Sequence, residues 1–290
     1  MGKVKIITDS NSGILQQEGK DAGIFVIPMP FTIAGNEYLE EISISQDEFY
    51  RFLSEDLDVT TSQPSQYYLQ EIFDEFLKEY DEIVYLPMTS GLSGTCANAT
   101  ALANRYDGRI QVVDNLRISV TLKNSVYEAL ELSRQGKCAK EIKTYLEAQK
   151  NMSSIYITLG TLKYLKRGGR ITPAVAALGS LLKIKPILFS NGGKFEKVAV
   201  SLNVAQAKKK IIMQLKNDLQ TKFKDLYYDG KMAVAVAQTQ NLVEAEKFKK
   251  EIINEIPNIK FLYVEPLSLS VSCHIGAGAL AAAVFPNTII

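Results

Sequence analysis

The sequence predicts an α/β fold of two domains, with a mostly parallel sheet and flanking helices in the N-terminal domain and a second α/β domain after it. Two observations support this prediction. Short apolar runs that resemble strands alternate with helix-like segments from residue 1 to about 155, as in a parallel sheet covered by helices. Beyond that point the chain changes character, with a hairpin pattern around Asn191, Gly192 and Gly193. The simplest division is therefore into domains of residues 1–155 and 156–290.

The apolar and amphipathic runs give the expected elements of the N-terminal domain. Strands are predicted at residues 3–8, 24–33, 83–86 and 109–113, and helices at 46–53, 67–80, 97–106, 118–134 and 139–150. Ser45 and Glu48 form a capping box at the start of one helix, and Ala34, Gly35 and Asn36 indicate a hairpin turn. Residues 59–65 are expected to form a polar loop that ends in the helix cap Ser65.

The second domain is predicted from the same patterns. Strands are expected at residues 154–159, 184–189, 195–200, 232–237 and 259–264, and long helices at 203–223 and 242–253. A helix at 174–182 is apolar on all sides, so we expect it to be buried or to line an apolar cavity. His274 is expected in a turn rich in Gly and Ser, before a helix of small residues.

Composition excludes several classes of function. The 290 residues are 46% hydrophobic and 22% charged, and 33 basic side chains balance 32 acidic ones, so net charge gives no reason to expect a nucleic-acid partner. The apolar runs before Asp9 and at residues 275–285 are too short for a signal peptide or for the ~18 residues of a membrane span. We therefore expect a cytoplasmic protein with at most transient membrane contact.

The three cysteines do not suggest a metal site or a disulfide framework. Cys96, Cys138 and Cys273 are odd in number and lack the spacing of metal ligands. We expect reduced thiols and no bound metal.

The segment at residues 86–95 is the first candidate site. It follows a strand and precedes a helix N-terminus, where backbone N–H groups favour an anion, and Gly91 and Gly94 allow close approach to the backbone. Thr89, Ser90, Ser93 and Thr95 add hydroxyl donors, but no Lys or Arg occurs between Ile83 and Asn104. Neutral donors suit one carboxylate better than a triphosphate, although a simple helix cap with two turn glycines remains an alternative.

A second group of hydroxyls follows residue 59. Thr60, Thr61 and Ser62 are consecutive, and Pro64 stiffens the chain after them. Ser65 alone is explained as a helix cap, whereas three successive hydroxyl residues exceed what one cap requires.

His274 is the single histidine of the chain. An imidazole beside hydroxyls donates to a carboxylate or acts as a base, so a serine hydrolase with Ser93 as nucleophile, His274 as base and Asp9 or Asp114 as orienting group is an alternative function. The sequence disfavours it, because a nucleophile elbow has Gly two residues after the Ser and this chain has Thr95 there.

Six motifs together resemble the DegV family. They occur in the family order and span residues 4–285: Ile7-Thr8-Asp9-Ser10, Thr61-Ser62-Gln63-Pro64-Ser65, Ser90-Gly91-Leu92-Ser93-Gly94-Thr95, Leu165-Lys166-Arg167-Gly168-Gly169-Arg170-Ile171, Ile184-Lys185-Pro186-Ile187-Leu188 and His274-Ile275-Gly276-Ala277-Gly278-Ala279-Leu280. The resemblance implies a two-domain protein that binds one long-chain fatty acid such as palmitate, stearate or oleate. It implies no catalytic residues, no cofactor and no metal, and a FakA-like kinase as the partner that phosphorylates the bound fatty acid for phospholipid synthesis.

The resemblance also implies roles for particular residues. Thr61 and Ser93 match the hydroxyls that hold the fatty acid carboxylate, with Ser62 and the loop at Gly94 beside them. His274 and Arg170 match a histidine and an arginine near the head group. The acyl chain is expected in an apolar tunnel of the C-terminal domain, lined by residues 174–182 and 184–189. One departure is the bulky segment 115–120, where family members usually have Gly and Ser.

Overall fold

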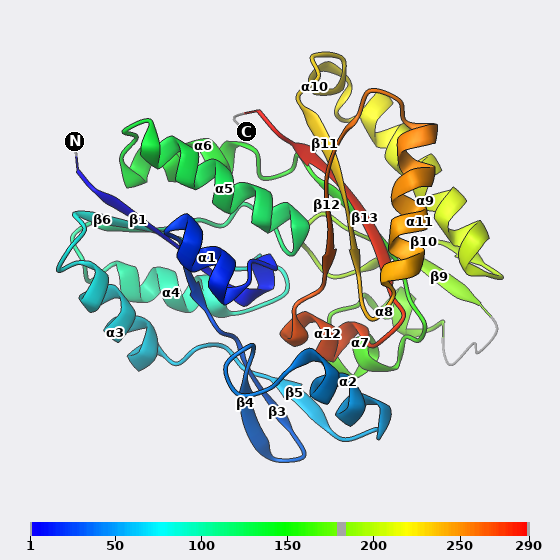
Figure 1. Ribbon diagram of the computed structural model, residues 1–290, viewed down its shortest axis with the longest axis horizontal. Helices are drawn as coiled ribbons and strands as arrows, with labels where there is room; N and C mark the ends of the chain where they lie inside the picture. The colour runs from blue at the N-terminus through cyan, green and yellow to red at the C-terminus, as the bar shows by residue number, and fades with distance from the viewer. Residues whose placement is uncertain (1, 179–183, 289–290) are drawn as a thin grey trace. The chain divides into compact units, whose positions relative to one another are not determined.

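The computed structural model describes residues 2–178 and 184–288 (Figure 1). The chain forms two compact units. The first unit contains the described residues up to Asn151 together with Ser268–Ser270, and the second contains the described parts of Met152–Leu267 and Val271–Thr288. The chain thus enters the first unit a second time for three residues shortly before its end.

The first unit is built on a parallel sheet with the strand order β2-β1-β6-β7. Its strands are β1 (Val4–Asp9), β2 (Phe25–Ile27), β6 (Glu82–Leu86) and β7 (Ile110–Val112), and all neighbouring pairs are parallel. The prediction of a mostly parallel N-terminal sheet is confirmed. Because parallel strands end on the same edge, the segments that follow β1 and β6 start side by side, where Thr8 pairs with Leu86.

Helices cover both faces of this sheet (Figure 1). α1 (Gln16–Ala22), α5 (Val120–Arg134) and α6 (Ala139–Ala148) pack on one face, and α3 (Gln66–Phe76) and α4 (Thr95–Ala103) pack on the other. An apolar core lies between the sheet and the helices on each face. Successive side chains of β1 point into alternate cores: Ile6 packs in the core that contains α5, and Ile7 packs in the core that contains α4. Each core is apolar, which explains why these strands are buried on both faces.

A small antiparallel sheet, in the order β4-β3-β5, completes the first unit. It consists of β3 (Pro30–Ile33), β4 (Asn36–Leu39) and β5 (Val59–Thr61). The predicted hairpin at Ala34–Asn36 is confirmed, but two expectations were wrong. Residues 24–33 form two strands in different sheets, because Pro28 and Pro30 lack the N–H that a continuous strand needs. The expected loop 59–65 begins as a strand.

The two predicted serine caps of the first unit are confirmed. The Ser45 Oγ accepts from the Glu48 N–H at 3.3 Å at the start of α2 (Gln46–Ser54), and the Ser65 Oγ accepts from the Tyr68 N–H at 3.1 Å at the start of α3. A short 3-10 turn, Ser10–Ser12, follows β1.

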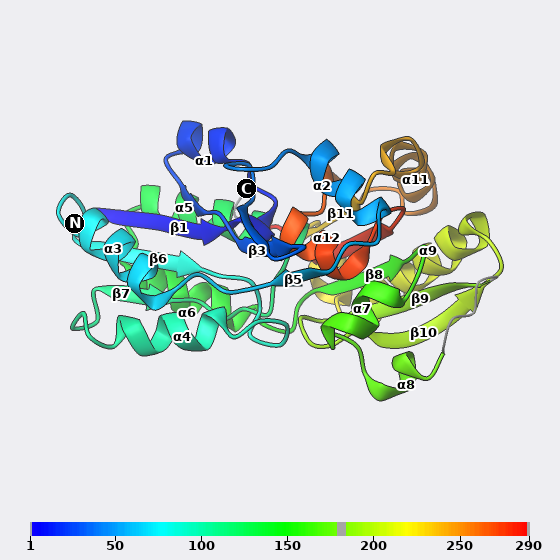
Figure 2. The same ribbon diagram turned by 90° about the horizontal axis from the view of Figure 1, so that it is seen from below.

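The second unit contains a mixed sheet with the order β10-β9-β8-β13-β11-β12. Its strands are β8 (Ser154–Thr158), β9 (Lys185–Ser190), β10 (Glu196–Ser201), β11 (Met232–Gln238), β12 (Lys260–Pro266) and β13 (Leu280–Pro286). The β9–β10 hairpin was predicted and is confirmed. α9 (Val204–Gln220) and α11 (Leu242–Glu255) pack on one face of this sheet (Figures 1 and 2), and α10 (Lys224–Tyr228) lies between them in sequence.

The expectation for the C-terminal segment was wrong. The small-residue segment after His274 is not a helix but the strand β13, which pairs with β8 on one side and with β11 on the other. His274 lies in the helix α12 (Leu269–Ile275) rather than in a turn. Alanine favours helices in isolation, but a buried position between two strands overrides that preference.

The predicted apolar helix at residues 174–182 is shorter in its described part. α8 covers Pro173–Ala176, and residues 179–183 lie outside the described part of the chain. Val175 is buried as expected, whereas Ala174 and Ala177 are exposed, so the expected burial of the helix on all sides is wrong for this part. α7 (Lys163–Gly168) precedes it and ends at Gly169, as the two glycines predicted.

Candidate functional site

The loop between β6 and α4 is organised by Thr89, a buried residue. The Thr89 Oγ1 accepts from the Gly91 N–H at 3.1 Å, and its carbonyl accepts from the N–H groups of Leu92 and Ser93, both at 3.3 Å. Its own N–H donates to the Arg117 carbonyl at 2.9 Å. The hydroxyl loop is therefore a hydrogen-bonded turn of fixed shape.

Ser93 lies at the end of this turn and is half-buried. Its Oγ accepts from the Thr95 N–H at 3.2 Å and lies 2.9 Å from the Thr95 Oγ1. Two hydroxyls that bond to one another use one proton, so the second O–H of the pair is available to donate. Ser93 thus stabilises the first turn of α4, and the pair offers a donor at the helix N-terminus.

The second hydroxyl group contacts the first through Gly94. Thr61 is half-buried at the end of β5, and the N–H of the exposed Ser62 donates to the Pro30 carbonyl at 3.2 Å. A Cβ atom added to Gly94 would lie 3.1 Å from the Gln63 Oε1. The Gln63 side chain thus lies close to Gly94, and the first unit brings together the two loops that carry Thr61, Ser62, Ser93 and Gly94.

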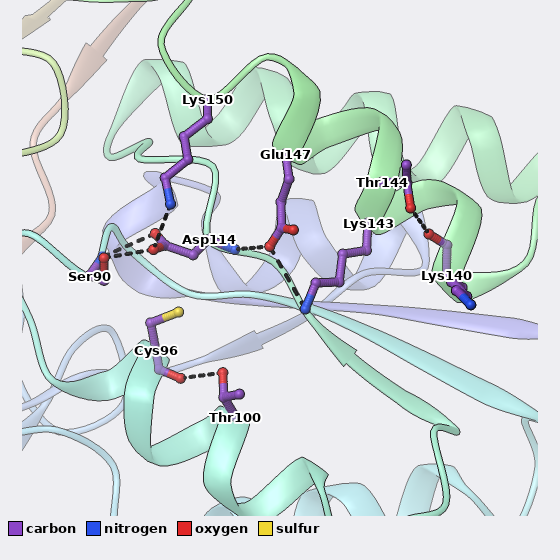
Figure 3. Close-up of polar contacts among 9 residues, drawn as sticks. All are labelled: Ser90, Cys96, Thr100, Asp114, Lys140, Lys143, Thr144, Glu147 and Lys150. Carbon is purple, nitrogen blue, oxygen red and sulfur yellow. Dashed lines mark hydrogen bonds and ion pairs between the residues drawn. The ribbon is translucent and has the colours of Figure 1, made fainter.

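Asp114 holds the neighbouring part of the loop (Figure 3). Its carboxylate accepts from the Ser90 Oγ at 2.6 Å and from the Ser90 N–H at 3.3 Å, and it lies 3.4 Å from the Lys150 Nζ. Partial burial acts to raise the pKa of Asp114, but the Ser90 donors and Lys150 lower it below its usual value. The carboxylate is therefore ionised and fixes Ser90 in place. Cys96 lies nearby, and burial, together with Asp114, raises the pKa of its thiol to about 11.

The geometry does not support the hydrolase alternative. The carboxylate of Asp9 accepts from the N–H groups of Asn11 at 3.1 Å and Met88 at 3.0 Å, and Asp114 is occupied by Ser90 and Lys150. Both candidate orienting carboxylates thus hold loops of the first unit in place. Burial raises the pKa of Asp9 to about 6.

Close glycine contacts fix the second group of candidate residues, which lies in the second unit. A Cβ atom added to Gly168 would overlap the His274 Nδ1, and one added to Gly276 would lie 2.5 Å from the Tyr164 Cδ2. Gly276 also has φ of +78°, which favours glycine. The C-terminal part of α7 therefore packs directly on the end of α12. The roles of Tyr164 and Gly168 were not predicted, although the adjacent glycines Gly168 and Gly169 at the end of α7 were the signal.

Arg170 adds a positive charge beside His274. The Arg170 Nη1 donates to the Gly168 carbonyl, which keeps the guanidinium next to the same contact. Burial, followed by the charge of Arg170, lowers the pKa of His274 to about 4. The imidazole is therefore neutral at pH 7, when one of its nitrogens carries a hydrogen and can donate to a carboxylate.

A buried polar network in the first unit was not predicted. The Glu40 carboxylate accepts from the Leu269 N–H at 2.5 Å and from the Ser10 Oγ at 2.7 Å. The Asn11 Oδ1 accepts from the Ser270 Oγ at 2.5 Å. These bonds tie the three-residue segment Ser268–Ser270 to the first unit, just before the chain continues to His274. Contacts between residues so far apart in sequence leave no local pattern to read.

The described residues contain neither a membrane-spanning helix nor a metal-binding cluster. No helix there has both the length and the apolar character to cross a bilayer. No cluster of three or more His, Cys, Asp or Glu side chains with the arrangement of a metal site occurs in residues 2–178 and 184–288.

Comparison with known proteins identifies the class of this α/β chain. A sequence model of the DegV family matches residues 3–287. A DegV domain-containing protein from Staphylococcus aureus is 30% identical over 280 residues, which cover 97% of this chain and 98% of the relative. The chain belongs to the DegV family.

Solved structures of the family agree with the fold. A DegV family protein from Thermus thermophilus, described by its fatty acid binding, superposes with a TM-score of 0.87 at 25% identity and covers 98% of this chain and 99% of its own. DegV from Bacillus subtilis, described as a fatty acid-binding protein, has a TM-score of 0.82 at 28% identity, with 99% and 100% of the two chains covered. The predicted fold class and family are confirmed.

Proposed function

We propose that this protein binds one long-chain fatty acid, with the carboxylate on the hydroxyls of Thr61 and Ser93 and with Ser62 and Gly94 beside them. One observation carries the proposal: the two hydroxyl loops meet at Gly94 and Gln63. The B. subtilis and T. thermophilus relatives, which are described as fatty acid binding, support this class of ligand. The family resemblance also gives roles near the head group to His274, a neutral donor, and to Arg170, a positive charge.

The acyl chain is proposed to occupy an apolar tunnel in the second unit. The face of its sheet opposite α9 and α11 is lined with buried small residues: Ala233, Ala235, Ala237, Ala281 and Ala283. Alternation along the strands places these alanines on the opposite side from the bulky core residues Val234, Val236 and Leu280. The same face also carries the buried apolar side chains Ile157, Leu188 and Phe285, and we propose that this apolar surface lines the tunnel.

Energetics give the two parts of the ligand different tasks. Burying about 14 methylene groups of a C16 chain at ~0.8 kcal/mol each gives a gross gain of about 11 kcal/mol. A few neutral hydrogen bonds to a carboxylate contribute less, but their geometry is directional. The tail therefore supplies affinity, and the head-group loops orient the ligand.

The test of fatty acid binding is native mass spectrometry of the purified protein, followed by denaturation and identification of the released molecule. We expect one fatty acid per chain, with about 14 to 18 carbon atoms, whose methylene groups supply the burial energy given above. A protein that carries no lipid and takes up none on incubation with oleate would contradict the proposal.

We further propose that the bound fatty acid is presented to a FakA-like kinase, which phosphorylates its carboxylate. The protein's own activity is then binding alone, consistent with carboxylates that serve as structural anchors. The test is a mixture of the oleate-loaded protein, the kinase and ATP, assayed for acyl phosphate by trapping with hydroxylamine. Absence of product with a kinase that is active on another family member would contradict this role.

A further inference from the structure

The segment that connects β7 to α5 is buried and strained. Asn115, Arg117, Ile118 and Ser119 are each less than 9% exposed. Leu116 has φ of +57° and Ser119 has φ of +54°, in the left-handed region that residues with side chains rarely adopt. Such backbone persists only where the surroundings impose it, and it is a reason to look for a function.

This segment binds two successive residues of the hydroxyl loop, Thr89 and Ser90. Asp114 binds Ser90 through its carboxylate, and the Arg117 carbonyl accepts the Thr89 N–H at 2.9 Å. Thr89 in turn accepts the Ser93 N–H. A continuous path of short contacts therefore runs from the Arg117 backbone to Ser93.

The Arg117 side chain extends into the helical layer of the first unit. It is 1% exposed, its Nη2 lies 3.5 Å from the Gln149 carbonyl at the end of α6, and it interacts electrostatically with the buried Glu128 of α5. A cation at a helix C-terminus is favourable, but the Nε and Nη1 atoms have no hydrogen-bond partner among the described residues. A buried guanidinium with this few bonds is expensive for stability alone.

We propose that Arg117 is a positioning residue for the head-group loop. Its guanidinium, anchored between Glu128 and the end of α6, fixes the carbonyl that holds Thr89, and Thr89 places Ser93 at the proposed carboxylate site. The inference rests on the proposed function, and it gives a purpose to the bulky segment 115–120, which departs from the Gly- and Ser-rich sequence that the family resemblance led us to expect.

The test is a double-mutant cycle on delipidated protein titrated with oleate. Arg117→Met keeps the length and apolar part of the side chain but removes the charge, and we expect oleate binding to weaken about tenfold. Ser93→Ala should weaken binding about tenfold in the native background but less than about twofold in Arg117→Met, because Ser93 is then no longer in place. The control is Arg134→Met, which removes an exposed arginine at the C-terminal end of α5 and should leave oleate binding unchanged.

Hydrogen exchange of the Thr89 amide gives a readout that does not require ligand. We expect this amide to lose protection in Arg117→Met while strand amides of β1 and β6 keep theirs. If Arg117→Met does not fold, Glu128→Gln, which is isosteric, should produce the same loss of protection and a smaller loss of affinity. Unchanged Thr89 exchange, or an undiminished Ser93→Ala effect in the Arg117→Met background, would overturn the inference. A native protein that binds no oleate would instead contradict the proposed function.

Discussion

The two groups of proposed head-group residues are held in place by different means. In the first unit, hydrogen bonds to the Thr89 side chain and backbone fix the hydroxyl loop, and each of these bonds requires a donor and an acceptor in the right direction. In the second unit, His274 is held by contact with Gly168, where there is no space for even one methyl group. The difference teaches that the first group is sensitive to lost donors and the second to added atoms.

The largest expected effect is in the second unit, where the packing around His274 depends on glycine. Gly276→Ala places a Cβ atom against the Tyr164 ring at a φ of +78°, so we expect it to lower the free energy of unfolding by about 3 kcal/mol. Gly278→Ala is the matched control, because it has the same φ but no atom within 4 Å of the added Cβ, and it should cost about 1 kcal/mol. Urea unfolding measures both, and equal losses would show that packing on Tyr164 does not hold α12.

The buried Glu40 makes the stability of the first unit dependent on pH. Burial raises the pKa of Glu40 from 4.5 to about 7 in spite of its bond from the Leu269 N–H. The unfolded chain loses this proton near pH 4.5 and the folded chain near pH 7, so the contribution of Glu40 to stability falls as pH rises through this window, by up to about 3 kcal/mol.

Glu40→Gln isolates this effect. The variant keeps an oxygen acceptor for Leu269 but does not ionise, so its unfolding free energy should rise relative to the native protein between about pH 4.5 and 7.5. Asp9, whose pKa of about 6 acts in the same direction, is present in both proteins and cancels. A difference between the two proteins that stays constant with pH would contradict the assignment.

Ser93→Ala tests whether donors control binding in the first unit. We expect about a tenfold loss of oleate affinity, which corresponds to one hydrogen bond to a charged group. Ser65→Ala is the control, because it removes a helix cap worth about 1 kcal/mol of stability without touching the proposed site. Similar binding losses in the two variants would mean that Ser93 acts only through folding.

The smallest expected effect concerns the charge beside His274. Arg170→Met should raise the pKa of His274 from about 4, but burial, which is the larger cause, should keep it below 6.5. Because the chain has one histidine, its imidazole signals in a heteronuclear NMR titration are unambiguous. Arg170→Lys should leave the pKa near its native value, and an equal change in both variants would exclude charge as the cause.

Much of the fold follows from local patterns. Alternating strand and helix segments predicted the parallel sheet, and the serine caps at Ser45 and Ser65 appear as expected, because these features depend on neighbouring residues. The errors arise where distant residues decide. The alanines of β13 are a strand because β8 and β11 flank them, and Pro28 and Pro30 divide an otherwise continuous apolar run between two sheets.

The candidate site was predictable to a similar extent. Its hydroxyl loops and glycines are visible in the sequence, since their chemistry is carried by residue type. The supports are not visible: Arg117, Glu40 and Tyr164 act through partners far away in the chain, and nothing local distinguishes a buried arginine from an exposed one. The shape of a site is thus harder to predict than its donors.

The central position of β13 has a consequence for synthesis of the protein. Leu280 pairs with both Thr158 and Gln238, so the sheet of the second unit lacks an interior strand until β13 has been made. The parallel sheet of the first unit has all its strands by Val112. On the ribosome, the parallel sheet of the first unit therefore has time to form while one edge each of β8 and β11 stays unpaired, and such edges make the nascent second unit prone to aggregation.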